Sequence, residues 1–290
     1  MKFAFIAAQK ASYSVTRMCR WLGVSRCGYY AWCARPEAAS AATDRRLAVD
    51  IAAVFTRSRR TYGSPRIVAE LRATGTAVGR RRVRRLMREN GLIARSKRRF
   101  VKPCQDVAAS SFAHNALNRE FDARRPDQRW VADTTEFWLP QGRVFLAVLL
   151  DLYSRKVVGW ATSPVNNADL VVRALDNALV TRRPAGPLLH HSDRGSPYAS
   201  WQYQKRLAAC GIATSMSRPG NCYDNAVAEA FFSTLKTEMP GAFDSLADAN
   251  RRLFDYIEVF YNQQRRHSAL GYLAPAEYER TFSRELRAAA

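Results

Sequence analysis

The spacing of apolar residues changes near Pro126 from the period of an α-helix to that of a β-strand. Apolar and β-branched residues fill 129–139, 143–153 and 155–162, and short turn segments separate these runs. They predict three consecutive strands joined as an antiparallel meander. Further elements are expected at about 167–181 (helix), 187–191 (strand), 200–210 (helix), 212–216 (strand), 223–238 (helix) and 245–264 (helix). Strands followed by alternating helices and strands indicate a mixed α/β sheet.

The N-terminal region predicts a helix-turn-helix unit at 14–33. Gly23 suits the left-handed position that ends a first short helix, and the side-chain oxygen of Ser25 suits the cap of a second one. An ordinary αα-hairpin has the same pattern, so the pattern alone leaves contact with DNA open.

A second helical unit follows, with a helix at 44–57, another that Ser64 caps and Pro65 begins, and a third at 79–91. The buried stripe of the third helix is expected to be Val83, Leu86 and Met87. The arginines expected on its other faces are Arg81, Arg84, Arg85 and Arg88. Six arginines on one short helix repel one another unless an anion lies opposite. We therefore expect contact with DNA phosphates here, rather than a solvated basic face.

The charge of the chain is concentrated in its first part. Among 290 residues, 46 Lys and Arg stand against 25 Asp and Glu, which gives a net charge of +21. Residues 1–125 hold 27 of the basic and 8 of the acidic residues, whereas 126–290 hold 19 and 17. A strongly basic region ahead of a nearly neutral one suggests a polyanionic partner, nucleic acid before membrane.

The sequence offers little support for a membrane or secreted protein. Its longest apolar run, 144–150, is far shorter than the roughly 18 residues of a membrane helix, and the first ten residues make an unlikely signal peptide. Six cysteines lack the paired spacing of a zinc site or a disulfide scaffold. We expect a cytoplasmic protein with reduced, mostly packed thiols.

These patterns divide the chain into four parts. We expect a first helix-turn-helix segment at 1–40, a second helix-turn-helix domain at 41–94, a basic linker at 95–125 and an α/β domain with C-terminal helices at 126–290.

Three acidic residues of the α/β domain stand out by position. Asp133 lies inside an apolar strand, Asp193 follows a buried strand, and Glu229 lies in a helix among apolar residues. If they converge, they form an all-oxygen site of the kind that Mg²⁺ or Mn²⁺ prefers, with room for two ions. Taken one at a time, a capping or salt-bridging role is favoured for Glu229 and nearly so for Asp193, so position alone leaves the metal site a hypothesis.

Longer motifs resemble a known family. The segments HHSDRGSPYAS (190–200), MSRPGNCYDNAVAEAFFSTLKTE (216–238) and YNQQRRHSALGYLAPAEYE (261–279) resemble the second-reading-frame product (OrfB) of bacterial insertion-sequence transposases, and 35 residues separate Asp193 from Glu229 as in integrase-like DDE recombinases. RTYGSPRI (60–67) and VSRCGYYAW (24–32) resemble the N-terminal helix-turn-helix segments of the same family.

The resemblance implies a ribonuclease-H-like (integrase) core in which Asp133, Asp193 and Glu229 form the catalytic, metal-binding triad. It also implies that Lys236, two turns beyond Glu229, contacts the DNA of the element's end. Asn225 lies on the same helical face, where DNA contact and helix capping are both open. His191 is expected to be a packed residue rather than a ligand, because imidazole suits Mg²⁺ poorly. Two further arginines could contact DNA or fix the last helix: Arg265 and Arg266.

The resemblance implies a DNA transposase that frees a 3′-hydroxyl at the element's end and joins it to another phosphodiester. Its expected partners are duplex DNA, a second copy of the chain, and the upstream reading-frame product (OrfA) as a fusion or partner. A non-catalytic DNA-binding regulator with the same fold is the alternative, and the presence of all three acids argues against it. A nuclease for RNA in hybrids is a third reading, disfavoured because helix-turn-helix units fit duplex DNA.

Overall fold

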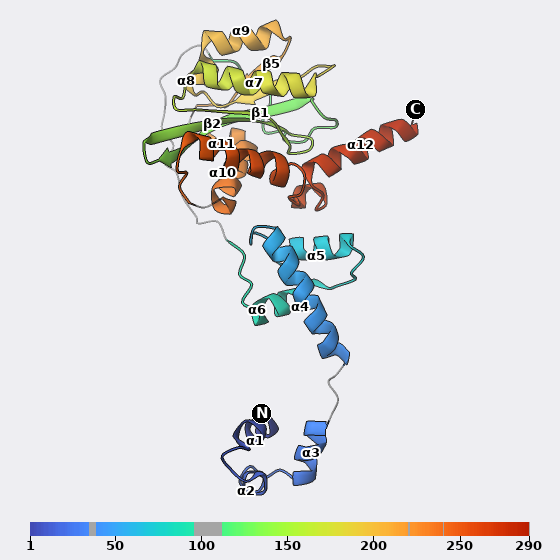
Figure 1. Cartoon of the computed structure of the whole chain (residues 1–290). Coiled ribbons are helices and arrows are strands. Elements are labelled where there is room, and N and C mark those ends of the chain that lie inside the picture. Colours follow the sequence, from blue (N-terminus) through green and yellow to red (C-terminus); the bar gives the residue numbers. More distant parts are fainter. Residues whose placement is uncertain (35–38, 96–111, 220, 240, 290) are drawn as a thin grey trace.

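The computed structural model describes residues 1–34, 39–95, 112–219, 221–239 and 241–289 (Figure 1). The region before the sheet is helical, as the apolar spacing predicts. Its helices are α1 (Lys2–Gln9), α2 (Val15–Trp21), α3 (Arg26–Ala34), α4 (Ala39–Arg57), α5 (Ser64–Ala73) and α6 (Arg80–Glu89).

A single five-stranded sheet organises the rest of the described chain. Its strands are β1 (Arg129–Leu139), β2 (Gly142–Asp151), β3 (Val157–Ser163), β4 (Leu189–Ser192) and β5 (Ala213–Met216), in the order β3-β2-β1-β4-β5. The first three strands are antiparallel neighbours, whereas β4 runs parallel to both β1 and β5. The mixed sheet and its initial meander are therefore confirmed.

Helices cover both faces of this sheet, as Figure 1 shows for α7 and α9 on one side and α10 and α11 on the other. The helical segments of this part are α7 (Ala168–Arg182), α8 (Ser196–Ala199), α9 (Trp201–Ala209), η1 (Cys222–Asn225), α10 (Ala226–Glu238), α11 (Leu246–Phe254), η2 (Asp255–Tyr261), η3 (Ser268–Leu270) and α12 (Pro275–Ala289). None of the described helices is both long enough and apolar enough to cross a membrane.

Alternation along β1 divides its side chains between two cores. Trp130 and Ala132 are buried with α7 and α9, whereas Val131 is buried with α10 and η2. Because successive side chains of a strand point to opposite faces, Asp133 lies on the α10 side. The strand thus directs one of the predicted acids toward the helix that carries another.

Close packing of α7 on β3 depends on Gly159. A Cβ at this position would lie 2.6 Å from the Cβ of Ala178 and 2.7 Å from its backbone nitrogen, well inside van der Waals contact. Only glycine lets the helix approach the strand this closely.

The first three helices form a small unit with its own core of Ile6, Met18, Cys19 and Tyr29. As expected, Gly23 has a left-handed φ of 60°, and the Ser25 hydroxyl accepts a hydrogen bond from the Gly28 N–H at 3.0 Å. Helix α1 was not expected, since its sequence reads only as a short apolar patch. Its apolar side chains gain a partner in α2, which local sequence does not reveal.

The second unit, α4–α6, shares one continuous hydrophobic core with the α10 side of the sheet domain. Val83, Leu86 and Met87 are buried as predicted. The prediction that Ser64 caps α5 is wrong by one residue, because Gly63 is the cap and Ser64 is the first helical residue. Pro65 still lies in the first turn, where its missing N–H leaves no intrahelical bond unmade.

The described part of the expected linker, from residue 112 onward, packs on the sheet domain. Leu117 is buried, and its N–H donates to the Ser215 hydroxyl at 3.0 Å. The Arg119 Nε donates to Asp224 at 2.8 Å. Side-chain contacts, and not a regular helix or strand, hold this segment, which is why its sequence shows no periodicity. The basic run at 97–99 lies outside the described residues.

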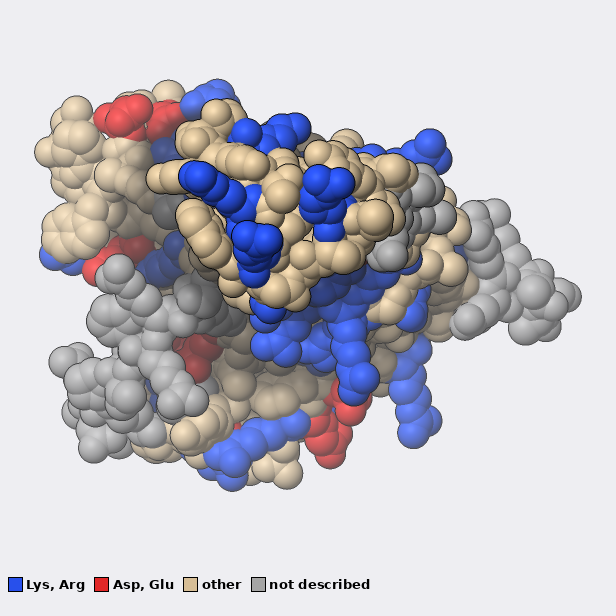
Figure 2. All heavy atoms as spheres, turned by 90° about the horizontal axis from the view of Figure 1, so that it is seen from below, with Lys and Arg blue, Asp and Glu red and all other residues tan. Residues whose placement is uncertain are grey.

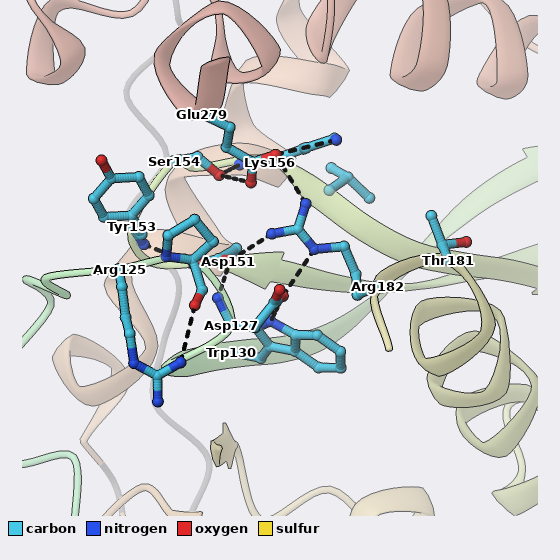
Figure 3. A network of polar contacts seen from close by, with 12 residues as sticks. Arg125, Asp127, Trp130, Asp151, Tyr153, Ser154, Lys156, Thr181, Arg182 and Glu279 are labelled. Carbon is cyan, nitrogen blue, oxygen red and sulfur yellow. Dashed lines mark hydrogen bonds and ion pairs between the residues drawn. The ribbon is translucent and has the colours of Figure 1, made fainter. Parts of the chain in front are cut away.

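A third C-terminal helix, α12, was also not expected. A polar network ties it to the sheet, with Arg182 at the end of α7 pointing between three carboxylates (Figure 3). The guanidinium lies 2.8 Å from Asp127, 3.3 Å from Asp151 and 2.8 Å from Glu279 of α12. Burial raises the pKa of Asp151 to about 7, although Arg182 and two backbone N–H groups oppose the shift.

Four cysteines of the described chain are free thiols, but the expectation that most are packed is wrong for them. Cys19 is buried, whereas Cys27, Cys33 and Cys210 are exposed. Cys104 lies outside the described residues.

Candidate active site

Asp133 lies on β1, and Asp193 directly follows the neighbouring parallel strand β4. Val131 of β1 is the register partner of His191 of β4, and each aspartate follows its paired residue by two positions. Neighbouring strands lie about 4.8 Å apart, so both carboxylates arise from one end of the β1–β4 pair. Each is held locally, since Asp133 Oδ1 accepts from the Thr134 N–H at 2.7 Å and Asp193 Oδ1 accepts from the Gly195 N–H at 2.9 Å.

Helix α10 begins directly beside this strand pair. Asn225, its first flanking residue, is buried and donates from Nδ2 to the backbone carbonyl of Ala132 at 3.1 Å. The hydrogen bond attaches the start of the helix to the residue before Asp133. Glu229 follows one turn later and is exposed rather than packed among apolar side chains, which corrects the expectation for its surroundings. Asn225 makes no side-chain capping bond, so its side chain joins helix to strand.

A buried carboxylate that the sequence analysis did not single out fixes the approach to α10. Asp224 is fully buried and accepts hydrogen bonds from Asn115 Nδ2 at 2.8 Å and from Arg119 Nε at 2.8 Å. Arg218 adds three more, from its backbone N–H at 3.0 Å and from Nε and Nη2 at 2.9 Å each. Hydrogen bonds from Arg218 and then Arg119 hold the pKa of Asp224 well below its usual range, against the opposing effect of burial. We call Asn115, Arg119, Arg218 and Asp224 the Asp224 clamp.

The donor chemistry at this edge fits a hard divalent cation. Asp133, Asp193 and Glu229 offer only carboxylate oxygens, the ligands that such cations prefer. Burial raises the pKa of Asp193 and so disfavours its ionised form, and a nearby cation would offset this effect. Asn225 adds a buried Oδ1 without a hydrogen-bond partner among the described residues. In the described chain, however, no three acidic, His or Cys residues lie close enough together to form a metal-binding group. The three carboxylates must therefore come closer together than they are in this structure for a shared metal site to form.

His191 is a packed residue, as the sequence analysis predicts. Its Nδ1 lies 2.8 Å from the Ser215 hydroxyl and its Nε2 lies 3.1 Å from the Ser217 hydroxyl. Burial lowers its pKa to about 4. With both ring nitrogens engaged, the imidazole has no nitrogen to offer a cation.

Comparisons with known proteins agree with this architecture. Models of the integrase core domain match residues 123–222 and 210–275, and a model of the HTH-like domain matches 42–100. The chain is 39% identical over 283 residues to the transposase InsF of insertion sequence IS3A from Escherichia coli, covering 96% of this chain and 98% of that protein. The chain belongs to the IS3-family transposases.

Other similar proteins extend the comparison. The transposase is 40% identical over 267 residues to an uncharacterized 31 kDa protein of insertion element IS600 from Shigella sonnei, covering 91% and 98% of the two chains. Among solved structures it is similar to the HTLV-2 integrase catalytic core domain in complex with magnesium, at 16% identity and a TM-score of 0.40, covering 54% of this chain and 98% of that one. The Mos1 mariner transposase catalytic domain is similar at 15% identity and a TM-score of 0.40, covering 53% and 74%.

Lys236 of the transposase lies seven residues beyond Glu229 on α10 and is exposed, like Glu229. Its Nζ lies 5.5 Å from the centre of the Phe137 ring of β1. The helix thus presents a carboxylate and an ammonium group on one exposed face, two turns apart.

The arginines of α6 fall into two groups. Arg82 and Arg85 bind Asp44 of α4, at 2.6 Å and 2.5 Å, so Asp44 fixes one side of the helix. Arg81, Arg84 and Arg88 are exposed and form no ion pair with the described residues. Seen from below, Lys and Arg gather in the middle of the molecular face, with fewer Asp and Glu (Figure 2).

The other two arginines for which DNA contact was considered have contacts within the protein. Arg265 is almost fully buried and binds Glu238 at the end of α10, at 2.6 Å. Arg266 binds Glu70 of α5 at 2.9 Å. The alternative considered from the sequence was that these residues fix the last helix; the structure shows this pairing with α10 and α5. The sequence carried no signal for it, because both partners are distant along the chain.

Proposed function

We propose that this transposase cleaves DNA at the 3′ ends of its insertion sequence and joins the freed ends to target DNA. Asp133, Asp193 and Glu229 are the proposed catalytic residues. The observation that carries the proposal is the pairing of β1 with β4, which brings two aspartates to one edge, beside the start of the helix that bears Glu229. Membership of a transposase family with an integrase core supports it.

The same three carboxylates would hold Mg²⁺ or Mn²⁺, as two ions, because hard cations of this kind prefer oxygen ligands. Such ions, when bound, supply charge neutralisation at the phosphate and a more acidic attacking hydroxyl. The chain itself contributes positioning. The Asn225 bond to Ala132 and the Asp224 clamp fix the start of α10, and Lys236 provides a cation for the DNA backbone next to Glu229.

DNA binding is assigned to the helical units at 1–40 and 41–94, and catalysis to 126–290. Arg81, Arg84 and Arg88 are the proposed phosphate contacts of α6, with Arg85 limited by its ion pairs to Asp44 and Glu89. We propose at least a dimer on DNA, because two element ends must be joined, and the upstream reading-frame product as a fusion or partner. A DNA substrate in a bacterial cell places the reaction in the cytoplasm.

Conservative substitution of each acid tests the assignment. Asp133→Asn, Asp193→Asn and Glu229→Gln should each lower cleavage and strand transfer of a labelled element end by about a hundredfold or more in Mg²⁺. Binding of the same DNA in a gel-shift assay should be nearly unchanged. The matched control is Glu136→Gln, also on β1, whose carboxylate is exposed and bound to Arg143.

Near-normal strand transfer by any of the three variants would refute the triad. If the wild-type chain binds the element end but never cleaves it in Mg²⁺ or Mn²⁺, with or without the upstream product, the non-catalytic regulator becomes the better description.

A further inference from the structure

A basic cavity lies where the α4–α6 unit meets the ends of α10 and α11. Its volume is about 510 Å³, and its lining comes from both parts of the chain. The lining residues are Thr56, Arg59, Arg60, Arg95, Glu238, Met239, Arg252 and Asp255. Four of the eight are arginines.

The acids of this cavity are already neutralised by other groups. Glu238 directs its carboxylate to Arg265, at 2.6 Å, and to the Tyr256 hydroxyl, at 2.8 Å. Asp255 is bound by Arg59 at 2.6 Å. Arg60 and Arg95 form no ion pair with the described residues; the Arg95 Nη1 has only the backbone carbonyl of Glu238, at 3.4 Å. The cavity therefore retains positive charge that no carboxylate of its lining offsets.

Arg60 has a left-handed backbone conformation, as do seven other non-glycine residues of the described chain. Helices α2, α5 and α6 are each followed by a glycine with positive φ, at Gly23, Gly75 and Gly91. Helix α4 is followed instead by Arg59 and Arg60, with φ of 58° and 60°. Left-handed conformations cost free energy in residues with a Cβ, and such outliers cluster at functional sites. Arg59 and Arg60 thus occupy two successive positions at which glycine would be less strained.

The cavity also lies in line with the candidate active site. Glu229, Lys236 and Met239 follow one another along α10, and Met239 lines the cavity. At about 1.5 Å per residue, the cavity end of the helix is roughly 15 Å from Glu229. One strand of a duplex carries a phosphate about every 3.4 Å of its axis, so this distance spans roughly four or five nucleotides.

We propose that this cavity binds a backbone phosphate of the element's DNA, roughly four or five nucleotides from the bond at the active site, through Arg60 and Arg95. The proposal rests on the proposed function in taking duplex DNA as the ligand. Arg59 is fixed by Asp255 and stacks on Phe260 at 4.8 Å, so it shapes the wall of the cavity rather than binding the phosphate.

The test measures the affinity of the full chain for a labelled duplex of the element's end over a range of salt concentrations. Arg60→Gly and Arg95→Gln should each reduce the magnitude of the slope of log K against log salt by about 0.9, the value for one lost phosphate contact. Arg60→Gly should also keep or raise the melting temperature, because glycine adopts the left-handed conformation without strain. The matched control is Arg183→Gln, an exposed arginine with φ of 46° that ends α7 on the other face of the sheet, which should leave the slope unchanged.

A second arm locates the phosphate. Single uncharged methylphosphonate substitutions are placed along each strand of the duplex, and one about four or five nucleotides from the cleavage site should weaken binding to wild type but not to Arg60→Gly. Unchanged salt slopes in both arginine variants, or equal loss with Arg183→Gln, would overturn the proposal. Cleavage is measured separately. Binding through the cavity without any cleavage would refute only the proposed function. Cleavage together with unaltered salt slopes in the arginine variants would refute only the phosphate site.

Discussion

Replacing Asp224 by Asn should separate the positioning of α10 from the binding of DNA. The amide keeps one acceptor oxygen, but its NH₂ group would replace the other, such as Oδ1, which now accepts from Arg119 Nε and Arg218 Nη2. The donors from Asn115, Arg119 and Arg218 then compete for a single uncharged acceptor. The segment before Asn225 and Glu229 loses the contacts that hold it against the sheet.

The size of the effect follows from burial. Removing one partner of a buried ion pair costs about 3–5 kcal/mol, but the Arg119 and Arg218 side chains are 45% and 47% exposed, so water re-solvates them. We therefore expect a loss of about 2–4 kcal/mol in the free energy of unfolding, or a melting temperature lower by about 5–10 °C. Mild acid should not imitate the substitution. The folded-state pKa of Asp224 is depressed, so its contribution is fully present above its usual pKa and is lost only as the pH falls below that value.

Differential scanning calorimetry and a strand-transfer assay check the two halves of this reasoning. At temperatures below its melting temperature, Asp224→Asn should show reduced strand transfer but should still bind the element end. Asp176→Asn is the control, since its ion pair with Arg206 is exposed and is worth about 0.5 kcal/mol. In a double-mutant cycle, Arg218→Gln should add much less to Asp224→Asn than it costs alone. Normal melting and normal strand transfer in Asp224→Asn would refute the positioning role.

Three further substitutions probe the fold. Gly159→Ala should destabilise the protein by about 3 kcal/mol or more in chemical denaturation, with partial recovery on adding Ala178→Gly; wild-type stability would contradict the close contact. Burial, with neighbouring arginines, lowers the pKa of His267 to about 2. The free energy of unfolding therefore rises with pH up to about 6.5, and about 2 kcal/mol is lost between pH 7 and pH 5. His267→Gln should flatten this dependence of stability on pH, and an unaltered dependence would exclude the effect. Glu238→Gln leaves Arg265 buried without a counter-charge and should cost about 3 kcal/mol or more, whereas a loss below about 1 kcal/mol would mean that water reaches the pair.

Features set by local pattern could be predicted from the sequence. The three-strand meander follows from apolar runs of strand length and the short turns between them, and Gly23 ends α2 because a left-handed residue is needed there. The buried stripe of α6 follows in the same way from helical spacing. In each case the residues that decide the structure lie within a few positions of one another.

Features set by distant partners could not. Helix α12 is fixed through Glu279, whose partner Arg182 is 97 residues away. The burial of Arg265 depends on Glu238, and the role of Asp224 depends on Arg119, 105 residues earlier. A charged residue in a sequence gives no sign of which opposite charge it will meet, so exposure and ion pairing became known only with the fold. For the candidate site, the position of Asp133 in an apolar strand was a local signal, but its grouping with Asp193 and Glu229 came from resemblance.

The hydrophobic core that α4–α6 shares with α10 and η2 has a mechanical consequence. Tyr62 donates to the carbonyl of Gln264 and accepts from the N–H of Arg266, so polar contacts lock the same seam. If the α6 arginines bind DNA as proposed, the shared core holds that DNA at a fixed distance from the proposed catalytic carboxylates. Inserting or deleting a few residues within 96–111 should therefore leave the position of the proposed cleavage unchanged.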